Sequence, residues 1–545
     1  MRANLNYFPM RQTRIKHLYC MALSLCSLWS LAQVPPKNWH LLDHHADGVY
    51  GISVEKAYQE LLKNRKPKKK VIVAIIDVGN DITHPALKGA IWKNKKEVEG
   101  NGIDDDRNGY IDDVHGWNFM GGCKVETYDC VREYVKFRAK FEMATDTMNA
   151  EVKHWISMKK QTEDFLTFRQ GVFKRTEPAI VALSKLNSYW QKKLERDSIY
   201  IKDVAHLNLP AETDSSIILA HTKVLRKVLQ TDSAKRSSVT LQEVVNAYQK
   251  VVDLYKGQYE TALTMIEQRD ASYFRRSSPG DDSYTNTDIH YGNADVSTAM
   301  PHGNGVAGII AATRLKPDVK GIASWVEVMP IVVVSQKVIG EERDKDVANA
   351  IRYAVDNGAR IINISIGKQS SPQKELVDAS VRYAASKGVL IFAAAGNDGV
   401  SNDEIFNYPN RHYADGGLAD NLFVVGATTS GAELVWKYSN YGKNEVDFFA
   451  PGDDIYSPAV AGTYNRDSGT SYAAPVAAGV AALIWNYYPT LSHRQVVQCI
   501  VQSVTSGDVL VTIPGTSTKT TFKVLSRAGG IINAFKALKV AASMH

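Results

Sequence analysis

Four short segments of this 545-residue chain place polar side chains beside glycine in ways that could support a reaction. An apolar run ends in Asp77, and a histidine-glycine pair at His302 opens a stretch of small residues. An alanine run ends in Gly396-Asn397, and a glycine-threonine pair precedes Ser471. Singly, each of these is an ordinary turn residue or helix cap. Together they supply the side chains that nucleophilic acyl transfer requires.

A serine hydroxyl is a weak nucleophile until a neighbouring imidazole takes its proton, and the imidazole needs a carboxylate on its other nitrogen. These requirements predict Ser471 as the nucleophile, His302 as the general base and Asp77 as the group that orients the imidazole. The tetrahedral intermediate also needs donors for its oxyanion. We expect Asn397 and the backbone N–H of Ser471 to provide them.

The order aspartate, histidine, serine along the chain resembles that of the subtilisin-like serine proteases. Three motifs carry the resemblance: Asp77-x-Gly, His302-Gly-x-x-Val-Ala-Gly and Gly469-Thr-Ser-x-Ala-Ala-Pro475. The resemblance covers about residues 40–124 and 285–540. It implies a serine endopeptidase that hydrolyses peptide bonds of a protein or peptide substrate through an acyl-enzyme on Ser471.

The same resemblance implies two substrate-binding segments. One follows a predicted strand and is expected to pair with the substrate backbone: Ser365, Ile366 and Gly367. The other is expected to form one wall of the primary specificity pocket: Ala394, Ala395 and Gly396.

The family pattern is broken in three segments. Val78 stands where serine or threonine usually follows the aspartate, Asn304-Gly305 stands where threonine-histidine is usual, and Tyr472 replaces a common methionine. These substitutions leave the predicted catalytic side chains in place. The first two are also the only sequence support for a second hypothesis, in which the fold is a catalytically weak scaffold whose helical insertion binds a partner protein.

An acidic segment beginning at Asp104 has the spacing of oxygen ligands in an EF-hand-like calcium loop, with Gly109 at the turn position. Position 12 of such a loop is His115 rather than glutamate, so a complete EF-hand is not expected. An acidic turn without metal is the alternative, but clustered carboxylates repel one another unless a cation lies between them. We therefore predict a structural calcium ion and no organic cofactor. The predicted ligands are Asp104, Asp106, Asn108, Tyr110 and Asp112.

Short apolar runs alternate with helical patterns over most of the chain, which is typical of a parallel sheet covered on both faces. The predicted fold is therefore a doubly wound α/β domain, and the family resemblance implies that it is of the subtilisin-like kind. Strands are predicted at 71–76, 326–334, 359–366, 389–395 and 422–427, and helices at 344–357, 371–387 and 471–487.

A helical insertion interrupts this pattern. Aromatic and aliphatic residues recur every three or four positions between Cys123 and Gln170, without glycine or proline, and predict one long amphipathic helix. A second helix is predicted to start near Thr240, because Thr240-x-x-Glu243 resembles a capping box. The predicted organisation is a signal peptide at 1–32, catalytic-domain parts at 33–124 and 285–545, and the insertion at 125–284.

The first 32 residues have a basic lead, a short apolar stretch and small residues before Gln33, which together indicate a signal peptide. We therefore expect an exported protein, either periplasmic or extracellular, with no transmembrane segment once the signal is removed. Removal would take away four basic residues and lower the formal net charge from +7 to +3. A charge this small gives no argument for nucleic acid as a partner.

Three cysteines remain after residue 32: Cys123, Cys130 and Cys499. In an oxidising compartment Cys123 and Cys130 could pair, and the sequence leaves that pairing open.

Overall fold

The computed structural model describes residues 35–123, 125–204, 207, 209–210, 213–222, 239–268, 289–315, 319–336 and 340–545. The predicted signal peptide at 1–32 lies outside these residues. The chain divides into two compact units. The larger consists of Val34–Gln170 and Lys256–His545, and the smaller includes Gly171–Tyr255.

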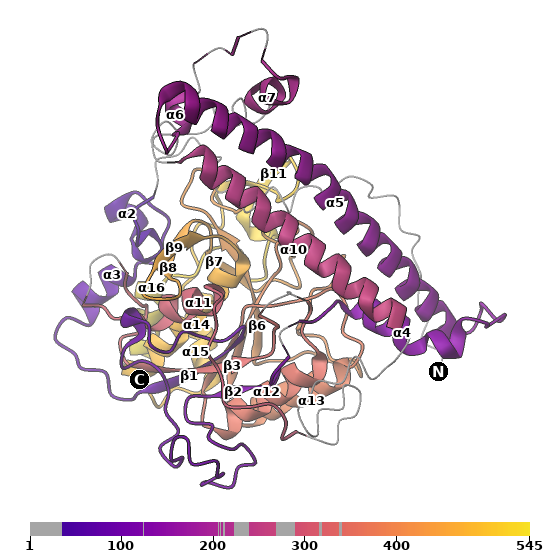
Figure 1. Cartoon of the computed structure of the whole chain (residues 1–545). Coiled ribbons are helices and arrows are strands. Elements are labelled where there is room, and N and C mark those ends of the chain that lie inside the picture. The colour runs from indigo at the N-terminus through magenta and orange to yellow at the C-terminus, as the bar shows by residue number, and fades with distance from the viewer. Residues whose placement is uncertain are drawn as a thin grey trace. The chain divides into compact units, whose positions relative to one another are not determined.

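A seven-stranded parallel sheet forms the centre of the larger unit (Figure 1). Its strand order is β2-β3-β1-β4-β5-β6-β7. The five predicted strands are confirmed, and β2 and β7 extend the sheet at its two edges. The strands are β1 (Val71–Asp77), β2 (Trp117–Asn118), β3 (Val326–Val332), β4 (Ile361–Ile364), β5 (Leu390–Ala394), β6 (Leu422–Thr428) and β7 (Phe448–Pro451).

Helices cover the sheet, as the near-continuous apolar strands predict. Helix α14 (Thr470–Tyr487) packs across β1 and β4 to β7 and against α11 (His302–Ala311). Helices α12 (Asp344–Asp356) and α13 (Lys374–Ser386) pack against each other, and α12 also contacts β1 and β3. Because α14 is apolar all round, nearly every one of its residues is buried.

Smaller elements complete the larger unit. The 3-10 and π-helical turns are η2 (Trp39–Leu41), η3 (Ala57–Leu61), η4 (Pro85–Leu87) and η7 (Phe522–Val524). The remaining helices are α2 (His44–Asp47), α3 (Val54–Lys56), α15 (His493–Gln502) and α16 (Ala534–Ser543). Two antiparallel hairpins are formed by β8 (Ile455–Pro458) with β9 (Tyr464–Asp467), and by β10 (Leu510–Thr512) with β11 (Lys519–Thr521).

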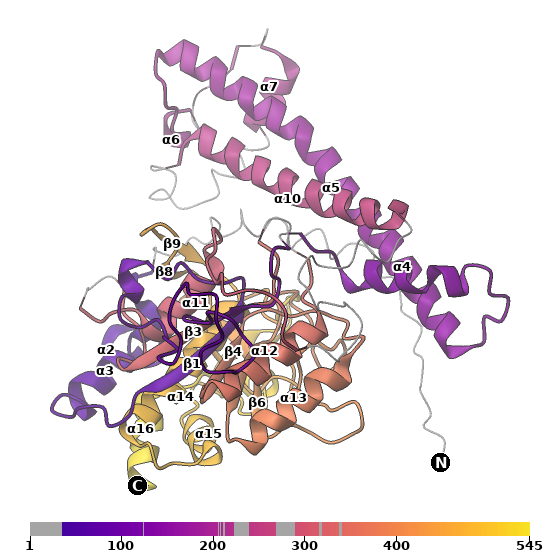
Figure 2. The ribbon, with the colours of Figure 1, turned by 60° about the horizontal axis from the view of Figure 1, so that its bottom comes forward.

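The region predicted as an insertion is helical, with α4 (Asp129–Phe141), α5 (Ala150–Leu194), α6 (Ile201–Val204), α7 (Ser215–Ala220) and α10 (Leu241–Gln268). Figures 1 and 2 show α5 and α10 side by side. The expected capping box is present, since the Thr240 N–H donates to Glu243 and the Glu243 N–H donates to Thr240 Oγ1. Helix α10 accordingly begins at the next residue, Leu241.

The single helix predicted across 123–170 is wrong, because the chain turns between α4 and α5. The side chain of Asn149 accepts hydrogen bonds from the N–H groups of Glu151 and Val152 and so caps the start of α5. Met148, expected on the buried stripe, is 75% exposed. Short polar side chains near the turn compete with the helix for backbone groups, and hydrophobic spacing alone does not register that competition.

The insertion has separate cores. In the larger unit, Val131 and Val135 of α4 pack with Phe165 of α5 and Met265 of α10. In the smaller unit, the second half of α5 and the first half of α10 enclose another cluster, which includes Leu183, Leu186, Trp190, Leu241 and Val244. Helix α4 and the adjoining ends of α5 and α10 therefore belong to the larger unit, inside the range predicted as a separate insertion.

Candidate active site

Asp77 and His302 meet at the carboxyl end of β1. Asp77 is the last residue of that strand and is fully buried, and His302 begins α11. The Nδ1–H of His302 donates to Asp77 Oδ1 at 2.8 Å, and the backbone N–H of Val78 donates to the same oxygen at 2.7 Å. The structure thus joins two residues that lie 225 positions apart in the sequence.

The surroundings of His302 make its imidazole more basic. Burial by itself lowers the pKa of His302, but the charge of Asp77, the hydrogen bond to Asp77 and the charge of Asp467 raise it, and the net pKa lies above the ordinary value of 6.5. The side chain remains 27% exposed, so a substrate can approach it. A basic, reachable imidazole whose Nδ1 is fixed by a carboxylate can act as a general base through Nε2.

Ser471 lies in the first turn of α14, where backbone N–H groups have no partner within the helix. Pro475 lacks the N–H that would otherwise bond to the carbonyl of Ser471 four residues earlier. Ser365 supplies the missing donor, because its hydroxyl bonds to the Ser471 carbonyl at 2.7 Å. The Ser471 hydroxyl in turn donates to the Ser365 carbonyl at 2.9 Å.

Asn397 follows β5 and is held by Thr470. Both the N–H and the hydroxyl of Thr470 donate to Asn397 Oδ1 at 2.9 Å. The Thr470 hydroxyl also accepts a hydrogen bond from the N–H of Gly396. Because the carbonyl end of the Asn397 amide is fixed by the residue next to Ser471, its Nδ2 donor group has a defined direction beside the serine.

The predicted backbone-pairing segment follows β4. Among the described residues, the backbone N–H and C=O groups of Ile366 and Gly367 have no hydrogen-bond partner. On one side Ser365 is fixed to Ser471, and on the other Lys368 forms an antiparallel bridge with Tyr408. An extended peptide could therefore pair with this short edge.

The predicted pocket wall follows β5 and is held by side-chain amides. Asn407 donates to the carbonyl of Ala394, and Asn402 donates to that of Ala395. Gly396 has a positive φ of 106°, and a Cβ there would lie 2.4 Å from the Nδ2 atom of Asn440. Only glycine fits this close approach.

The predicted catalytic and substrate-binding residues thus follow the carboxyl ends of neighbouring strands or stand at the first turns of α11 and α14, which is where sites form in open parallel sheets. Sequence reasoning missed three polar neighbours: Thr470 on Asn397, and Tyr472 and Asp467 beside His302. Thr470 and Tyr472 flank Ser471 in the sequence, so their proximity was a usable signal. Asp467 had none.

The acidic segment brings two of the predicted metal ligands, Asp104 and Asp106, together with a third carboxylate. Carboxylate oxygens of Glu97, Asp104 and Asp106 lie within 4.8 Å of one another. Glu97 was not predicted. This residue is 6% exposed, and its Oε2 atom is buried without a hydrogen-bond partner among the described residues.

The side chains of the other predicted ligands make hydrogen bonds within the chain, as the Asp104 carboxylate also does with the N–H groups of Asn108 and Gly109. The carboxylate of Asp112 accepts hydrogen bonds from the backbone N–H groups of Gly100, Asn101 and Gly102. The side chain of Asn108 bonds to the N–H of Tyr110 and to Asp113, and the Tyr110 hydroxyl donates to the carbonyl of Ile289. Three carboxylates with a buried unpartnered oxygen are a donor set that suits a hard divalent cation.

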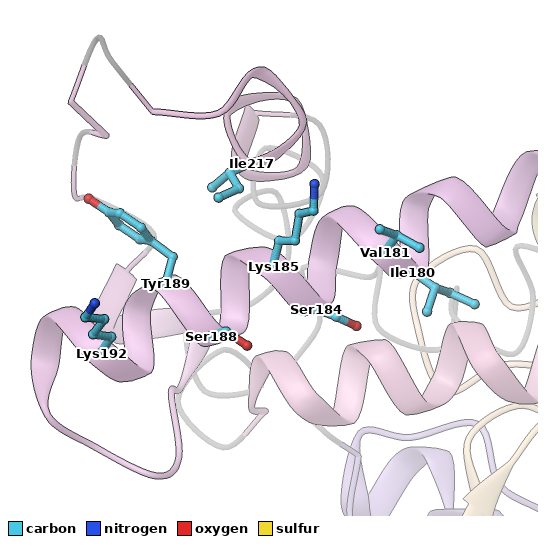
Figure 3. Close-up of a pocket in the computed structure, with 8 residues that line it drawn as sticks. All are labelled: Ile180, Val181, Ser184, Lys185, Ser188, Tyr189, Lys192 and Ile217. Atoms are coloured by element: carbon cyan, nitrogen blue, oxygen red, sulfur yellow. The ribbon is translucent and has the colours of Figure 1, made fainter.

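One cavity lies in the smaller unit, far along the sequence from the residues above. It has a volume of about 630 Å³ and is drawn in Figure 3. Its lining consists of Ile180, Val181, Ser184, Lys185, Ser188, Tyr189, Lys192 and Ile217. None of these is a carboxylate or a histidine, so the cavity lacks an acid–base pair for hydrolysis.

Among the described residues, Cys123, Cys130 and Cys499 are not joined in disulfides, and the Cys123 thiol donates to the carbonyl of Val125. Burial raises the pKa of the Cys130 thiol to about 12. Among the described helices, none is both long and apolar enough to cross a bilayer.

Comparison with known proteins gives a consistent family. The profile described as "Subtilase family" matches residues 68–529. Subtilisin DY of Bacillus licheniformis is 35% identical over 36% of this chain and 67% of its own length. Subtilisin BL of Lederbergia lenta is 35% identical over 38% of this chain and 70% of its own length. A thermostable alkaline protease of Halalkalibacterium halodurans is 33% identical, and the match spans 37% of this chain and 52% of that protein.

Proposed function

Because the chain belongs to the subtilase family and is a serine endopeptidase, we propose that it cleaves proteins or peptides through an acyl-enzyme on Ser471. His302 accepts the proton of the Ser471 hydroxyl and returns it to the leaving amine, while Asp77 keeps the imidazole in the required tautomer. The observation that carries the proposal is the 2.8 Å hydrogen bond between His302 Nδ1 and Asp77 Oδ1 at the carboxyl end of β1.

The oxyanion site is formed by Asn397 Nδ2 and the backbone N–H of Ser471. The two bonds from Thr470 to Asn397 Oδ1 support this assignment, because they orient the amide before the substrate arrives. The Ser471 hydroxyl bonds to Ser365 in the resting chain, so it turns towards His302 Nε2 when the substrate binds. Apo enzymes often hold catalytic hydrogen bonds loosely in this way.

The test is labelling of residues 33–545 with a fluorophosphonate probe, which reacts with activated serines without requiring a known substrate. We expect one adduct, on Ser471, and none in the Ser471→Ala variant. A folded chain that carries no adduct would contradict the proposal and favour the catalytically weak scaffold.

We also propose a structural calcium ion at Glu97, Asp104 and Asp106. The mutual approach of these carboxylates and the unpartnered buried oxygen of Glu97 support the site. Of the described basic groups, Lys96 approaches Asp106 at 3.8 Å, but its side chain is 76% exposed and offsets little of the charge. A bound ion would hold together the loop that leads from the region after β1 to β2.

Calorimetric titration with calcium tests this site. We expect Glu97→Gln and Asp104→Asn to weaken binding at least tenfold. Asp105→Asn is the matched control, because Asp105 lies in the same loop but outside the cluster. Calcium at about 100 times its Kd should stabilise the folded chain by ~2.7 kcal/mol. Equal binding by all variants would place the ion elsewhere.

Export follows from residues 1–32, with cleavage before Gln33, and leaves a periplasmic or extracellular enzyme. Sequencing the amino terminus of the natural protein tests this proposal. A mature chain that starts at Gln33 is the expected result, and retention of Met1 would contradict it.

The helical insertion is proposed to restrict which substrates reach the cleft. Support comes from its first helix, α4, which begins at Asp129. Asp129 Oδ2 accepts a hydrogen bond from Lys368 Nζ at 2.7 Å, and Lys368 directly follows Gly367 of the backbone-pairing segment. The start of the insertion, at Asp129, therefore lies against one end of the segment that is proposed to pair with the substrate backbone. Docking of a partner protein is the alternative role.

A further inference from the structure

Tyr472, the residue after Ser471, lies against the imidazole of His302. The two ring centroids are 5.7 Å apart and the planes meet at 72°, so the contact is edge-on. Tyr472 is 2% exposed and stands in the first turn of the rigid helix α14. The imidazole therefore has a fixed aromatic surface on the side from which α14 approaches.

The Tyr472 phenol is itself anchored. Its hydroxyl donates to Asp467 Oδ2 at 2.9 Å, and Asp467 Oδ1 accepts the backbone N–H of Ser468. Burial and the neighbouring Asp467 charge raise the pKa of Tyr472 far above the ordinary value, so the phenol stays protonated and keeps donating. Asp467 thereby remains in place as a second carboxylate near His302, after Asp77.

Gly305 provides the space for this ring. It lies in α11 three residues after His302, and a Cβ built on it would meet Tyr472 Cε1 at 2.7 Å. That distance is shorter than real carbon contacts allow, and the ring cannot retreat because it is buried. Glycine at 305 and tyrosine at 472 are therefore a complementary pair.

The carboxylate of Asp77 is held by hydrogen bonds through only one of its two oxygens, among the described residues. Both of its described hydrogen bonds reach Oδ1, from His302 and Val78, and Asp77 Oδ2 is buried with no partner among the described residues. Val78 has no hydroxyl that could reach this oxygen. An Asp77 carboxylate anchored through one oxygen gives the imidazole less orientation than one anchored through both.

We propose that Tyr472 and Asp467 are positioning residues for His302: the ring fixes the imidazole plane, and the anchored Asp467 charge favours the imidazolium that forms during catalysis. This inference rests on the proposed function, in which His302 is the general base. It unites Val78, Gly305 and Tyr472, three departures from the usual family pattern, in one alternative arrangement around the imidazole.

The groups that face His302 set the sign of the expected effect. They are Asp77 from β1, Asp467 from β9 and the neutral phenol of Tyr472 from α14. Both carboxylates favour the protonated imidazole, which cannot act as a base. Removing the Asp467 charge should therefore move the acidic limb of the reaction to lower pH.

The experiment measures the rate constant for fluorophosphonate labelling of Ser471 as a function of pH. We expect Asp467→Asn to lower the midpoint of the acidic limb by several tenths of a pH unit and to lower the plateau rate. Tyr472→Ala should lower the plateau about tenfold, and Tyr472→Phe, which keeps the ring, should restore most of that loss. A merely structural role would not move the midpoint.

Matched controls come from a tyrosine–aspartate pair elsewhere in the larger unit. The Tyr383 hydroxyl donates to Asp356 at 2.5 Å on the surface, so Tyr383→Phe and Asp356→Asn remove the same groups away from His302. Both control variants should leave the midpoint of the acidic limb and the plateau rate of labelling unchanged.

A double-mutant cycle tests whether Gly305 acts by leaving space for the Tyr472 ring. Gly305→Ala should slow labelling while Tyr472 is present, and should add no further loss to Tyr472→Ala. Additive losses, or an unmoved midpoint in Asp467→Asn, would overturn the inference. Titration of the His302 ring by NMR in the Ser471→Ala background reads the same shift without catalysis. If Asp467→Asn lowers the pKa of His302 in this NMR titration but the unaltered chain is not labelled, the proposed function is refuted and the positioning of His302 by Tyr472 and Asp467 is not.

Discussion

Asn397 is proposed to donate to the oxyanion, and the N–H and hydroxyl of Thr470 hold the Oδ1 end of its amide. A donor aimed at the oxyanion acts mainly in the transition state, because the charge it stabilises develops there.

Asn397→Ala is therefore expected to lower kcat by roughly 10²–10³ with little change in KM, the magnitude found when such a donor is removed from subtilisin. Steady-state kinetics on a peptide substrate checks this. Thr470→Val, which keeps the backbone donor but removes the hydroxyl donor, should cause a smaller loss. A change confined to KM would make Asn397 a ground-state binding residue.

At the scale of elements, a buried ion-pair cluster joins the start of α4 to the segment after β4 and the start of α12. Lys368 Nζ lies 2.7 Å from Asp129 and 2.9 Å from Asp344, and Arg132 also pairs with Asp129. All of these side chains are almost fully buried, so water cannot replace a lost partner.

Lys368→Met should lower the free energy of unfolding by about 3–5 kcal/mol, because it removes the cation that pairs with buried Asp344 and one of the two described cations that pair with Asp129. Urea denaturation gives the value. The control is Lys160→Met, which removes a lysine from an exposed i,i+4 pair with Asp164 and should cost less than about 0.5 kcal/mol. Similar losses in both variants would show that the buried cluster adds nothing.

The same cluster predicts a pH dependence of stability. Burial raises the pKa of Glu342 from 4.5 to about 7 despite the nearby Lys368 charge. A carboxyl group whose pKa is higher in the folded chain stabilises that chain below the unfolded pKa, and the contribution disappears as pH rises through the folded value. Unfolding free energy measured from pH 4.5 to 7 should therefore fall more steeply in the unaltered chain than in Glu342→Gln. Parallel curves would contradict this.

At the scale of the whole molecule, the chain combines one large unit with a smaller helical unit at 171–255. Helices α5 and α10 lie close together at the boundary of the larger unit, where the side chain of Gln170 donates to the Tyr259 hydroxyl at 2.9 Å. A short glycine linker from Gln170 to Lys256 can therefore replace the smaller unit and leave Asp129 on Lys368.

This shortened chain is expected to label Ser471 at the unaltered rate but to cleave a broader set of peptides, because restriction of access is proposed to lie in the insertion and not in the catalytic residues. Profiling both forms against a peptide library is the measurement. Equal labelling is the control for an intact larger unit. Identical cleavage profiles would contradict restriction by residues 171–255 and favour partner docking.

The sequence by itself determined the residue types and their order: near-continuous apolar strands, the polar residues that follow them and the small-residue helices at His302 and Ser471. These are local properties, so the parallel sheet and the residues at its carboxyl edge could be predicted. The capping box at Thr240 could also be predicted, because its partners are three residues apart.

Tertiary structure decided what depends on distances between remote segments. Four features join residues that no short motif links. They are the contact of Tyr472 with His302, the position of Asp467 near His302, the Lys368 cluster and the approach of Glu97 to Asp104. Asp112 fits the spacing of a calcium loop, yet the carboxylate that lies with those of Asp104 and Asp106 is that of Glu97. Spacing specifies which atoms are available, and only the folded backbone determines which partners reach them first.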